Sequence, residues 1–478
     1  MKLPTTCHQL SKENQMNKNR REILRMAGVG AAAATVGIIP TVTNMGGKAE
    51  AAVTVIKQVV VIGGGFGGST VAKYLKLWGQ GKIAVTHVDI NASYTSPILS
   101  NLVLNGQKTL TNLTFSLATA AARNGNQFKQ GKATIDRAAR KVTVTKLDGT
   151  IVAVLPYDKL VLSPGIEFNY LPSMALANGT LKDDTLPIPH AWKSGTQVTN
   201  LKAQLDKMPS RNGTYVLCIP KKPYRCPPGP YERACVVADI LKRVKGGGNV
   251  IVFDANVPTI PGDNYSAIQA ETHTFTTAFT GQFAGIVEYV SNAELLEVGS
   301  TGGQFGTKYV SVKLGDGSLR DEYANVLNVL PEHKAGDIAF AAGLISPGNR
   351  FVPVDLKSYA TTVDPNVYVI GDSHSSGQPK AGHVANSEAK VCADAIVREF
   401  GILPPHFPAE VPVTNSACYS PITTTTASWL TAGYRYNPNT GAMDRVVESF
   451  NEAEMPSGDN YKMMLAWANN LFADTFSV

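Results

Sequence analysis

The sequence has little of several features that would decide its class at once. Only 6 of its 478 residues are cysteine, so a small scaffold held together by disulfides is excluded. No uninterrupted apolar run reaches 18 residues, and the sequence therefore predicts no membrane-spanning helix. Charged residues make up 17% and hydrophobic residues 44%, a balance that excludes an intrinsically disordered chain. The length is enough for roughly two to four folded domains.

A charge excess of one sign is also missing from most of the chain. The formal net charge is +7, but residues 1–51 contain seven Lys or Arg and only three Glu. The remainder therefore has a net charge of only +3. Because nucleic-acid-binding domains are usually strongly basic, we expect no nucleic-acid partner.

The N-terminal residues resemble an export signal. Arg20 and Arg21 stand shortly before an apolar stretch at residues 26–39, which is shorter than the roughly 20 residues of a spanning helix. An Ala-Glu-Ala sequence at residues 49–51 fits a cleavage site. We expect a twin-arginine signal peptide over residues 1–51 and a periplasmic mature protein that is not integral to the membrane. The alternative interpretation is a basic, mobile tail.

Five cysteines would remain after such cleavage, and none of them stands in a CxxC pair or in a Cys/His cluster with metal-ligand spacing. We therefore expect no metal site and no haem attached to this chain. Three of the five lie in segments that predict buried helices or strands, and we expect them to be core residues. These three are Cys218, Cys235 and Cys392.

A dinucleotide-binding unit follows directly after the predicted signal. Residues 59–62 are a continuous apolar run, typical of a buried parallel strand, and a GxGxxG pattern and a helical pattern come next. Residues 83–88 predict the second strand, which ends at Asp89, 21 residues after Gly68. At that spacing a carboxylate accepts the ribose hydroxyls. The predicted phosphate-binding loop contains Gly63, Gly65, Phe66, Gly67 and Gly68.

Two later segments indicate that the nucleotide is FAD. Residues 157–165, which end at Gly165, resemble the strand that returns to the sheet in flavoproteins with two dinucleotide domains. Residues 366–372 resemble their late FAD motif, in which an aspartate, here Asp372 after Gly371, binds the ribityl chain. Alone, this Gly-Asp pair is more often a simple turn. Three motifs in the right order predict FAD.

A second α/β unit lies between these motifs. Residues 215–219 predict a strand, 231–244 a helix and 249–254 another strand. Flavin disulfide reductases bind NAD(P)H at such a unit through a second glycine-rich loop. Here residues 220–230 are rich in proline, which lacks the N–H donors that a pyrophosphate needs. We therefore expect no NAD(P)H site.

The predicted fold is α/β, with two Rossmann-like domains, the second inserted in the first, and a C-terminal α+β domain. The predicted domains are an FAD-binding domain at 52–170 and 328–410, a second Rossmann-like domain at 171–327, and a C-terminal domain at 411–478.

The proline-rich loop carries a resemblance to a known family. Its Arg-Cys-Pro-Pro-Gly-Pro-Tyr-Glu-Arg sequence at residues 225–233 resembles that of the flavoprotein subunit of flavocytochrome c sulfide dehydrogenase. Sulfide:quinone oxidoreductases are the related, membrane-facing branch. Further segments that share the resemblance are residues 190–193, 328–331, 341–344 and 415–420.

The resemblance implies a redox disulfide between Cys226 and Cys418, which sulfide attacks to leave a persulfide and a thiolate. It places Cys418 nearer the flavin and leaves Cys226 to receive sulfide. The function it implies is oxidation of sulfide to sulfur or polysulfide, with electrons passing through FAD to a c-type cytochrome. The alternative interpretation of both cysteines is that they are buried, inert thiols.

Three further residues match family positions, each with an ordinary alternative. Glu232 matches a glutamate near the flavin that exchanges protons with sulfur, or it only complements the helix dipole. Lys380 follows the late FAD motif, where a cation stabilises reduced flavin, or it is a surface lysine. Trp467 resembles an aromatic residue at the flavin edge, or it fills the core.

One departure from the family bears on the cofactor. The flavocytochromes attach FAD through a cysteine, and Ser96 stands at the corresponding position. Because serine offers no comparable thiolate, we expect non-covalent FAD. Two other functions stay open at this point: a sulfide:quinone oxidoreductase, and a non-catalytic flavoprotein that serves as an assembly or electron-docking partner.

Overall fold

The computed structural model describes residues 55–170, 187–404 and 411–478. The predicted export signal lies outside the described residues, so the signal and its cleavage site stay predictions. The predicted domain boundaries near residues 170 and 410 border undescribed stretches and stay predictions as well. No helix in the described ranges is long and apolar enough to cross a membrane.

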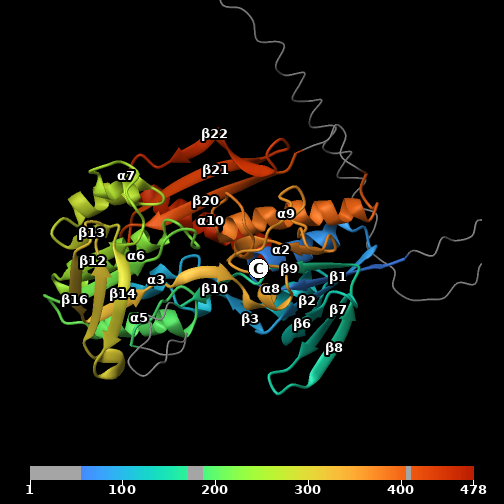
Figure 1. Ribbon diagram of the computed structural model, residues 1–478, viewed down its shortest axis with the longest axis horizontal. Coiled ribbons are helices and arrows are strands. Elements are labelled where there is room, and N and C mark those ends of the chain that lie inside the picture. Colours follow the sequence, from blue (N-terminus) through green and yellow to red (C-terminus); the bar gives the residue numbers. More distant parts are fainter. Residues whose placement is uncertain (1–54, 171–186, 405–410) are drawn as a thin grey trace, which may run out of the picture. The chain divides into compact units, whose positions relative to one another are not determined.

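The first sheet is parallel and has five strands in the order β19-β9-β1-β2-β5 (Figure 1). Val59 and Val61 of β1 face a cluster that contains helices α2 and α9, while Val60 and Ile62 face the opposite cluster. Both faces of the sheet are therefore buried, which explains the continuous apolar run in β1. The strands are β1 (Lys57–Ile62), β2 (Ile83–Asp89), β5 (Gln127–Gln130), β9 (Lys159–Leu162) and β19 (Val367–Val369).

Helices cover one face of this sheet, and a small antiparallel sheet with a short helix covers the other. The covering helices are α2 (Phe66–Trp78) and α9 (Gly382–Glu399). The opposite cover is formed by β6 (Lys132–Asp136), β7 (Lys141–Thr145), β8 (Ile151–Pro156) and α8 (Asp337–Ala341).

A second parallel sheet, in the order β13-β12-β11-β17, is formed entirely by chain between β9 and β19. One parallel α/β unit is thus inserted in another, which confirms the predicted fold. The strands are β11 (Thr214–Ile219), β12 (Asn249–Asp254), β13 (Val287–Ser291) and β17 (Val326–Val329). Its two faces are covered by α5 (Thr196–Lys207) and α6 (Gly229–Ile240), and by β14 (Glu294–Ser300), β15 (Lys308–Lys313) and β16 (Leu319–Ala324).

Helix α6 begins earlier than its sequence pattern predicts. The expected helix covered residues 231–244, but α6 starts at Gly229 and continues after Ile240 as a π-helical turn, Leu241–Lys245. Pro228 is its N-cap residue and Pro230 lies in its first turn. Proline is tolerated there because the first-turn N–H groups have no intrahelical partner.

The C-terminal segment adds an antiparallel sheet and a helix, coloured red in Figure 1. Side chains of even-numbered residues along β20 share one face, so Ser416, Cys418 and Ser420 point the same way. The elements are β20 (Val413–Pro421), β21 (Ala427–Asn437), β22 (Ala442–Glu452) and α10 (Gly458–Phe476). Shorter elements include β3 (Ser93–Thr95), α3 (Asn101–Leu104), β4 (Thr114–Ser116), α4 (Leu117–Arg123), β10 (Ile166–Asn169), α7 (Thr272–Thr277) and β18 (Glu332–Ala335).

Candidate active site

The loop between β1 and α2 can close only with glycine at its key positions. Gly63 has φ +110°, and a Cβ there would lie 2.2 Å from the carbonyl oxygen of Ser163. A Cβ at Gly68 would lie 1.8 Å from the carbonyl oxygen of Gly63, and one at Gly67 would lie 2.5 Å from the Ser163 hydroxyl. Side chains are excluded from this turn, so the backbone and the N-terminus of α2 are left open to a phosphate group.

Phe66 contributes to this loop mainly through its backbone. Its ring is buried and packs against Tyr94, with centroids 5.8 Å apart, and against Phe476 at 5.6 Å. As the first residue of α2 it presents an N–H that has no partner within the helix. A Cβ at Gly65 would lie 3.2 Å from the Tyr94 ring, so this side of the loop is closely packed.

Two carboxylates lie where the sequence predicts FAD contacts. Asp89 ends β2, and its two oxygens accept the N–H groups of Gly64 at 2.6 Å and Asn91 at 2.7 Å. Each oxygen keeps a further lone pair for a ribose hydroxyl. Asp372 has a buried Oδ1 that no described group hydrogen-bonds. A buried acceptor without a partner is costly, and a ribityl hydroxyl would satisfy it.

The late motif that carries Asp372 is held in place by buried polar contacts. Gly371 has φ +74°, and its N–H donates to Oε2 of Glu388 at 2.7 Å. Lys380 Nζ donates to the carbonyl oxygens of Asp372, at 2.9 Å, and His374, at 2.6 Å. Gly165 joins the same assembly, because its carbonyl oxygen accepts the Gly336 N–H at 3.1 Å.

Lys380 is 8% exposed, so its interpretation as a surface lysine is wrong. Its ammonium also lies 3.8 Å from the centroid of the Phe351 ring. Burial lowers the pKa of Lys380 to about 8, while the nearby Asp372 carboxylate opposes that shift. Taken together, the glycine loop, the open acceptor of Asp372 and this cation fit FAD, and they would hold its pyrophosphate, ribityl chain and flavin.

Cys226 lies directly against this late motif. Its N–H donates to the carbonyl oxygen of Lys380 at 2.7 Å, and its own carbonyl oxygen accepts the Gly229 N–H at 2.9 Å. Cys226 also has φ +59°, a backbone conformation that non-glycine residues seldom adopt. The loop therefore holds Cys226 next to Lys380 at a cost in backbone strain.

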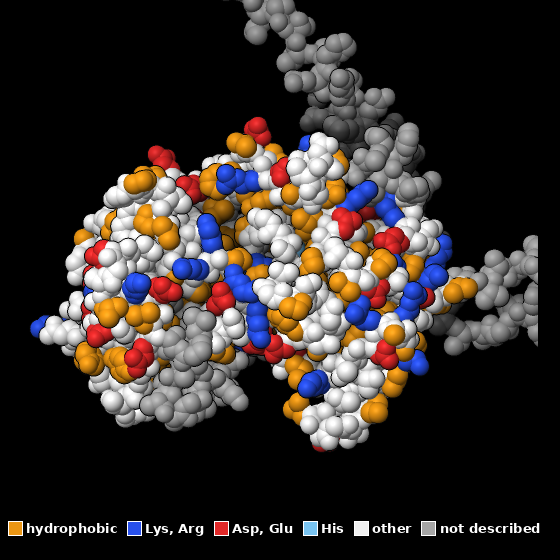
Figure 2. Space-filling view, viewed as in Figure 1, with side chains coloured by type: hydrophobic (Ala, Val, Ile, Leu, Met, Phe, Trp, Pro, Cys, Tyr) orange, Lys and Arg blue, Asp and Glu red, His pale blue; other side chains and the backbone are white. Residues whose placement is uncertain are grey.

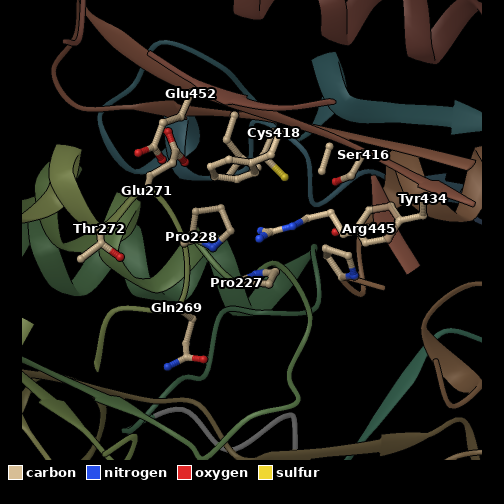
Figure 3. Close-up of a pocket in the computed structure, with 15 residues that line it drawn as sticks. Pro227, Pro228, Gln269, Glu271, Thr272, Ser416, Cys418, Tyr434, Arg445 and Glu452 are labelled. Carbon is tan, nitrogen blue, oxygen red and sulfur yellow. The ribbon is translucent and has the colours of Figure 1, made fainter. Parts of the chain in front are cut away.

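Cys418, on β20, lines a cavity of about 280 Å³ that also contacts Pro227 and Pro228 of the proline loop (Figure 3). Both thiols are free in the structure, and they lie close enough for a negative charge on Cys226 to raise the pKa of Cys418. Burial is the main cause that raises the pKa values of both thiols. The pKa of Cys226 rises to about 12, and the pKa of Cys418 rises well above its usual value. The structure thus brings together the two cysteines that the resemblance pairs, and the disulfide itself stays a prediction.

Glu232 is buried beside the cysteines, in the first turn of α6. Asn101 donates its Nδ2–H to Oε1 of Glu232 at 2.8 Å. Burial raises the pKa of Glu232 to about 8, and its charge in turn raises the pKa of Cys226. The carboxyl can therefore hold or release a proton near neutral pH, which helix-dipole complementation alone does not require.

Asn101 and Arg233 hold Glu232 in position, and the sequence interpretation missed both. Arg233 is 2% exposed, donates its Nε–H to Oδ1 of Asn101 at 2.9 Å and stacks on Trp192 at 4.7 Å. Its guanidinium also donates to the carbonyl oxygens of His190 and Ala191. The segment at 190–193 therefore has a structural role, and a charged Glu-Arg pair inside a buried helix is the signal that indicates it.

A second buried carboxylate, Glu271, borders the same cavity and was also missed. It precedes α7, is 2% exposed and accepts the Ser420 hydroxyl at 2.5 Å (Figure 3). Burial raises the pKa of Glu271 to about 7. Its sequence neighbourhood carries no recognisable signal, because the contact with Ser420 depends on the approach of β20.

The second sheet has its own acid in the position where NAD-binding units have one, and that acid is fully occupied. Asp254 ends β12, and its Oδ2 accepts the hydroxyls of Tyr231 at 2.7 Å and Tyr289 at 2.8 Å. Its Oδ1 accepts the N–H of Asn256 at 2.9 Å. No lone pair is left in an open position for a ribose hydroxyl.

The remaining predicted residues have plain structural surroundings. The hydroxyl of Ser96 accepts the Ile98 N–H at 3.0 Å within a buried turn. Trp467 packs on Tyr419 with centroids 5.2 Å apart, on the face of β20 opposite Cys418. Cys218, Cys235 and Cys392 are core residues, as predicted. Among the described residues, no cluster of His, Cys, Asp or Glu is suited to a metal ion.

Two family models match consecutive segments of this chain. Residues 57–197 match the pyridine nucleotide-disulphide oxidoreductase family. Residues 198–331, which include the proline loop, match the central part of the flavoprotein chain of sulfide dehydrogenase (flavocytochrome c). This segment of the chain is similar to the flavocytochrome c sulfide dehydrogenase flavoproteins. The resemblance stated from the sequence is therefore confirmed, and the matches support a sulfide-related flavin oxidoreductase with FAD as its cofactor.

Solved structures agree on the fold. The sulfide:quinone oxidoreductase of Aquifex aeolicus matches with a TM-score of 0.69 and 16% identity, over 88% of this chain and 91% of that chain. A ferredoxin reductase of Rhodopseudomonas palustris matches with a TM-score of 0.56 and 16% identity, over 80% and 89%. An NAD-dependent persulfide reductase of A. fulgidus matches with a TM-score of 0.53 and 16% identity, over 87% of this chain and 77% of that chain.

Proposed function

We propose that this protein oxidises sulfide to sulfur or polysulfide through a disulfide between Cys226 and Cys418, and passes the electrons through FAD to a c-type cytochrome. The observation that carries the proposal is the convergence of two cysteines and a buried carboxyl, Glu232, beside the late FAD motif. The match of the proline-loop segment to a sulfide dehydrogenase family supports the substrate class.

Each cysteine has a separate task in this proposal. Cys418 lines the cavity and receives sulfide, while Cys226, bound through its backbone to Lys380, becomes the thiolate next to the flavin. This order is the reverse of the one that the resemblance implies. The cavity supports it, because Cys418 and not Cys226 is among the residues that line it.

Residues near the two cysteines transfer protons and supply positive charge. Glu232, held by Asn101, takes up or returns the proton of Cys226, whose own high pKa disfavours the free thiolate. Lys380, when protonated, supplies a positive charge beside the flavin site. FAD, when bound, accepts the electron pair from the thiolate and releases it to the acceptor.

The acceptor is the part of the proposal that needs a direct test. We expect sulfide-dependent reduction of a soluble c-type cytochrome to exceed reduction of a water-soluble quinone analogue at equal concentration. Faster quinone reduction would favour a sulfide:quinone oxidoreductase, which the fold match leaves as the second candidate. On the face shown in Figure 2, hydrophobic side chains are scattered among charged ones, a distribution that suits a soluble acceptor.

A periplasmic location by the twin-arginine route is also part of the proposal. It rests on Arg20, Arg21 and the apolar residues 26–39. Changing both arginines to lysine should leave the protein in the cytoplasmic fraction. Unchanged export of that variant would contradict the route.

Free and widely separated cysteines would favour the non-catalytic alternative. The influence of Cys226 on the pKa of Cys418 supports an active pair instead. Reduction of the flavin by sulfide under anaerobic conditions tests this point directly, and an unreduced flavin would favour the non-catalytic function.

A further inference from the structure

The cavity at Cys418 contains a carboxylate for which the proposed function has no task. Glu271 is 2% exposed, and its Oε1 has no hydrogen-bond partner among the described residues. Its Oε2 accepts the hydroxyl of Ser420 at 2.5 Å. A buried carboxyl with one hydrogen-bonded oxygen and one unpaired oxygen is oriented, and the unpaired oxygen can accept a proton.

The position of Glu271 sets it apart from Glu232. Cys418 and Ser420 lie on the same face of β20, so the strand that presents the sulfur also presents the hydroxyl that orients Glu271. Glu271 lines the cavity with Cys418, whereas Glu232 is not among the lining residues. After burial, the largest electrostatic influence on Cys226 comes from Glu232, and Glu271 influences Cys418 more than Glu232 does.

We propose that Glu271 is a second proton-transferring residue, which deprotonates hydrogen sulfide in the cavity as the sulfur attacks Cys418. This inference rests on the proposed function and assigns it a further catalytic residue. The two cysteines are then each served by their own carboxyl, Glu271 on the cavity side and Glu232 on the flavin side.

The step balances with groups that the proposed function already contains. Hydrogen sulfide gives one proton to Oε1 of Glu271, and its sulfur forms a bond to Sγ of Cys418. The bond between Cys418 and Cys226 breaks, and its electron pair leaves with Cys226 as the thiolate. The products are a Cys418 persulfide, a protonated Glu271 and the Cys226 thiolate, which carries the two electrons onward.

Glu271 lies in a buried part of this cavity, and that burial gives the proton transfer a purpose. Neutral hydrogen sulfide enters such a space more readily than its anion, because burial penalises charge. The anion is the stronger nucleophile, so the proton has to be removed inside the cavity. Burial raises the pKa of Glu271 to about 7, which lets it accept that proton and release it near neutral pH.

Other charged groups also face Glu271 and contribute to its titration. Glu452 on β22 raises its pKa, and the hydroxyls of Ser420 and Ser428 lower it. Arg445, whose guanidinium points into the cavity, stacks on Phe450 at 4.8 Å (Figure 3). Besides Glu271, the titratable and charged groups at or near the cavity are Cys226, Glu232, Cys418, Tyr434, Arg445 and Glu452.

The test is the pH dependence of flavin reduction by saturating sulfide, followed anaerobically by stopped flow in the FAD-loaded protein. At saturation the rate reports groups in the substrate complex. In the unmodified protein the rate should rise with pH through about 7 as Glu271 loses its proton. Glu271→Gln should lack this rise and react about 100-fold more slowly at pH 8.

Two further variants separate a catalytic role from a structural one. Glu452→Gln removes a carboxylate that lines the same cavity, and it should keep the rise. Ser420→Ala removes the hydrogen bond that favours the charged form, so it should move the midpoint up by about one pH unit. Ser420→Ala also provides the test if Glu271→Gln does not fold.

Infrared difference spectra provide a readout that does not depend on turnover. A protonated-carboxyl band that titrates near pH 7 should be present in the unmodified protein and absent from Glu271→Gln. An unchanged pH profile in Glu271→Gln, with an active unmodified protein, would overturn this inference alone. A flavin that sulfide does not reduce at any pH would overturn the proposed function together with it.

Discussion

The two parallel sheets of this protein share an architecture and differ in the loop that comes after their first strand. In the first sheet, β1 leads through a glycine loop into α2, and the carboxylate of Asp89 remains available at the end of β2. In the second, β11 leads through a proline loop into α6, and Asp254 is occupied by two tyrosine hydroxyls. One loop is built to bind a dinucleotide, and the other carries a cysteine.

This difference shows how one kind of fold supports two chemistries. The glycine loop leaves backbone N–H groups and space where a side chain would clash. The proline loop removes N–H donors and holds Cys226 in a strained conformation against Lys380. The shared fold therefore sets the position of each loop, and the residues of the loop decide the function.

A matched pair of glycine substitutions, one in each loop, tests most strongly whether the two loops have different tasks. Gly68→Ala places a Cβ 1.8 Å from the carbonyl oxygen of Gly63, so the turn has to open. We expect FAD affinity to fall at least tenfold, about 1.4 kcal/mol, and activity to fall with it. Gly229→Ala, whose Cβ would lie 2.9 Å from Sγ of Cys226, should keep its flavin and lose sulfide oxidation.

The flavin-to-protein absorbance ratio and the sulfide assay together measure both outcomes. Loss of flavin from Gly229→Ala, or full flavin content in Gly68→Ala, would contradict the division of tasks between the two loops.

Substitution of either cysteine should remove turnover and leave the flavin bound. We expect Cys226→Ser and Cys418→Ser to lose steady-state sulfide oxidation by about three orders of magnitude, because neither can form the disulfide. Cys418→Ser keeps the thiol of Cys226, whose backbone N–H binds the carbonyl oxygen of Lys380, so in the proposed order it should show a long-wavelength charge-transfer band when that thiol ionises.

The absorbance spectrum distinguishes which cysteine receives sulfide and which one lies next to the flavin. Since the pKa of the Cys226 thiol is raised to about 12, the band should appear only on the alkaline side of its usual range. A band seen only in Cys226→Ser would restore the order that the resemblance implies. Near-normal turnover in either variant would remove the disulfide from the mechanism.

The electron donor provides a smaller test that needs no substitution. We expect NADH to leave the flavin oxidised under anaerobic conditions in which sulfide bleaches it. The physical reasons are the prolines of the second loop and the occupied carboxylate of Asp254. Bleaching by NADH at a rate similar to that with sulfide would show that the second sheet retains a nicotinamide site.

The mode of FAD attachment should give the smallest effect. Ser96 offers no thiolate, and its hydroxyl is engaged within a buried turn. Acid denaturation should therefore release all of the flavin into the supernatant. Yellow colour on the precipitated polypeptide would contradict non-covalent binding.

Much of the fold could be predicted because its signals are local. The apolar run of β1, the glycines and Asp89 specify a dinucleotide unit within about 30 residues of chain. The start of α6 was predicted less well, since the apolar pattern does not reveal that prolines fit its first turn. The buried state of Lys380 was equally invisible, because a lysine is usually exposed.

The sequence by itself determined the kind of cofactor site, and its resemblance to a known family named the two cysteines. Glycine patterns and strand runs act over short stretches of chain, so they can be interpreted without coordinates. Only the tertiary structure brought Cys418 to Cys226 across 192 residues, placed Asn101 on Glu232 and set Glu271 in the cavity. Such contacts depend on how strands and helices pack, and burial then shifts the pKa values that the chemistry needs.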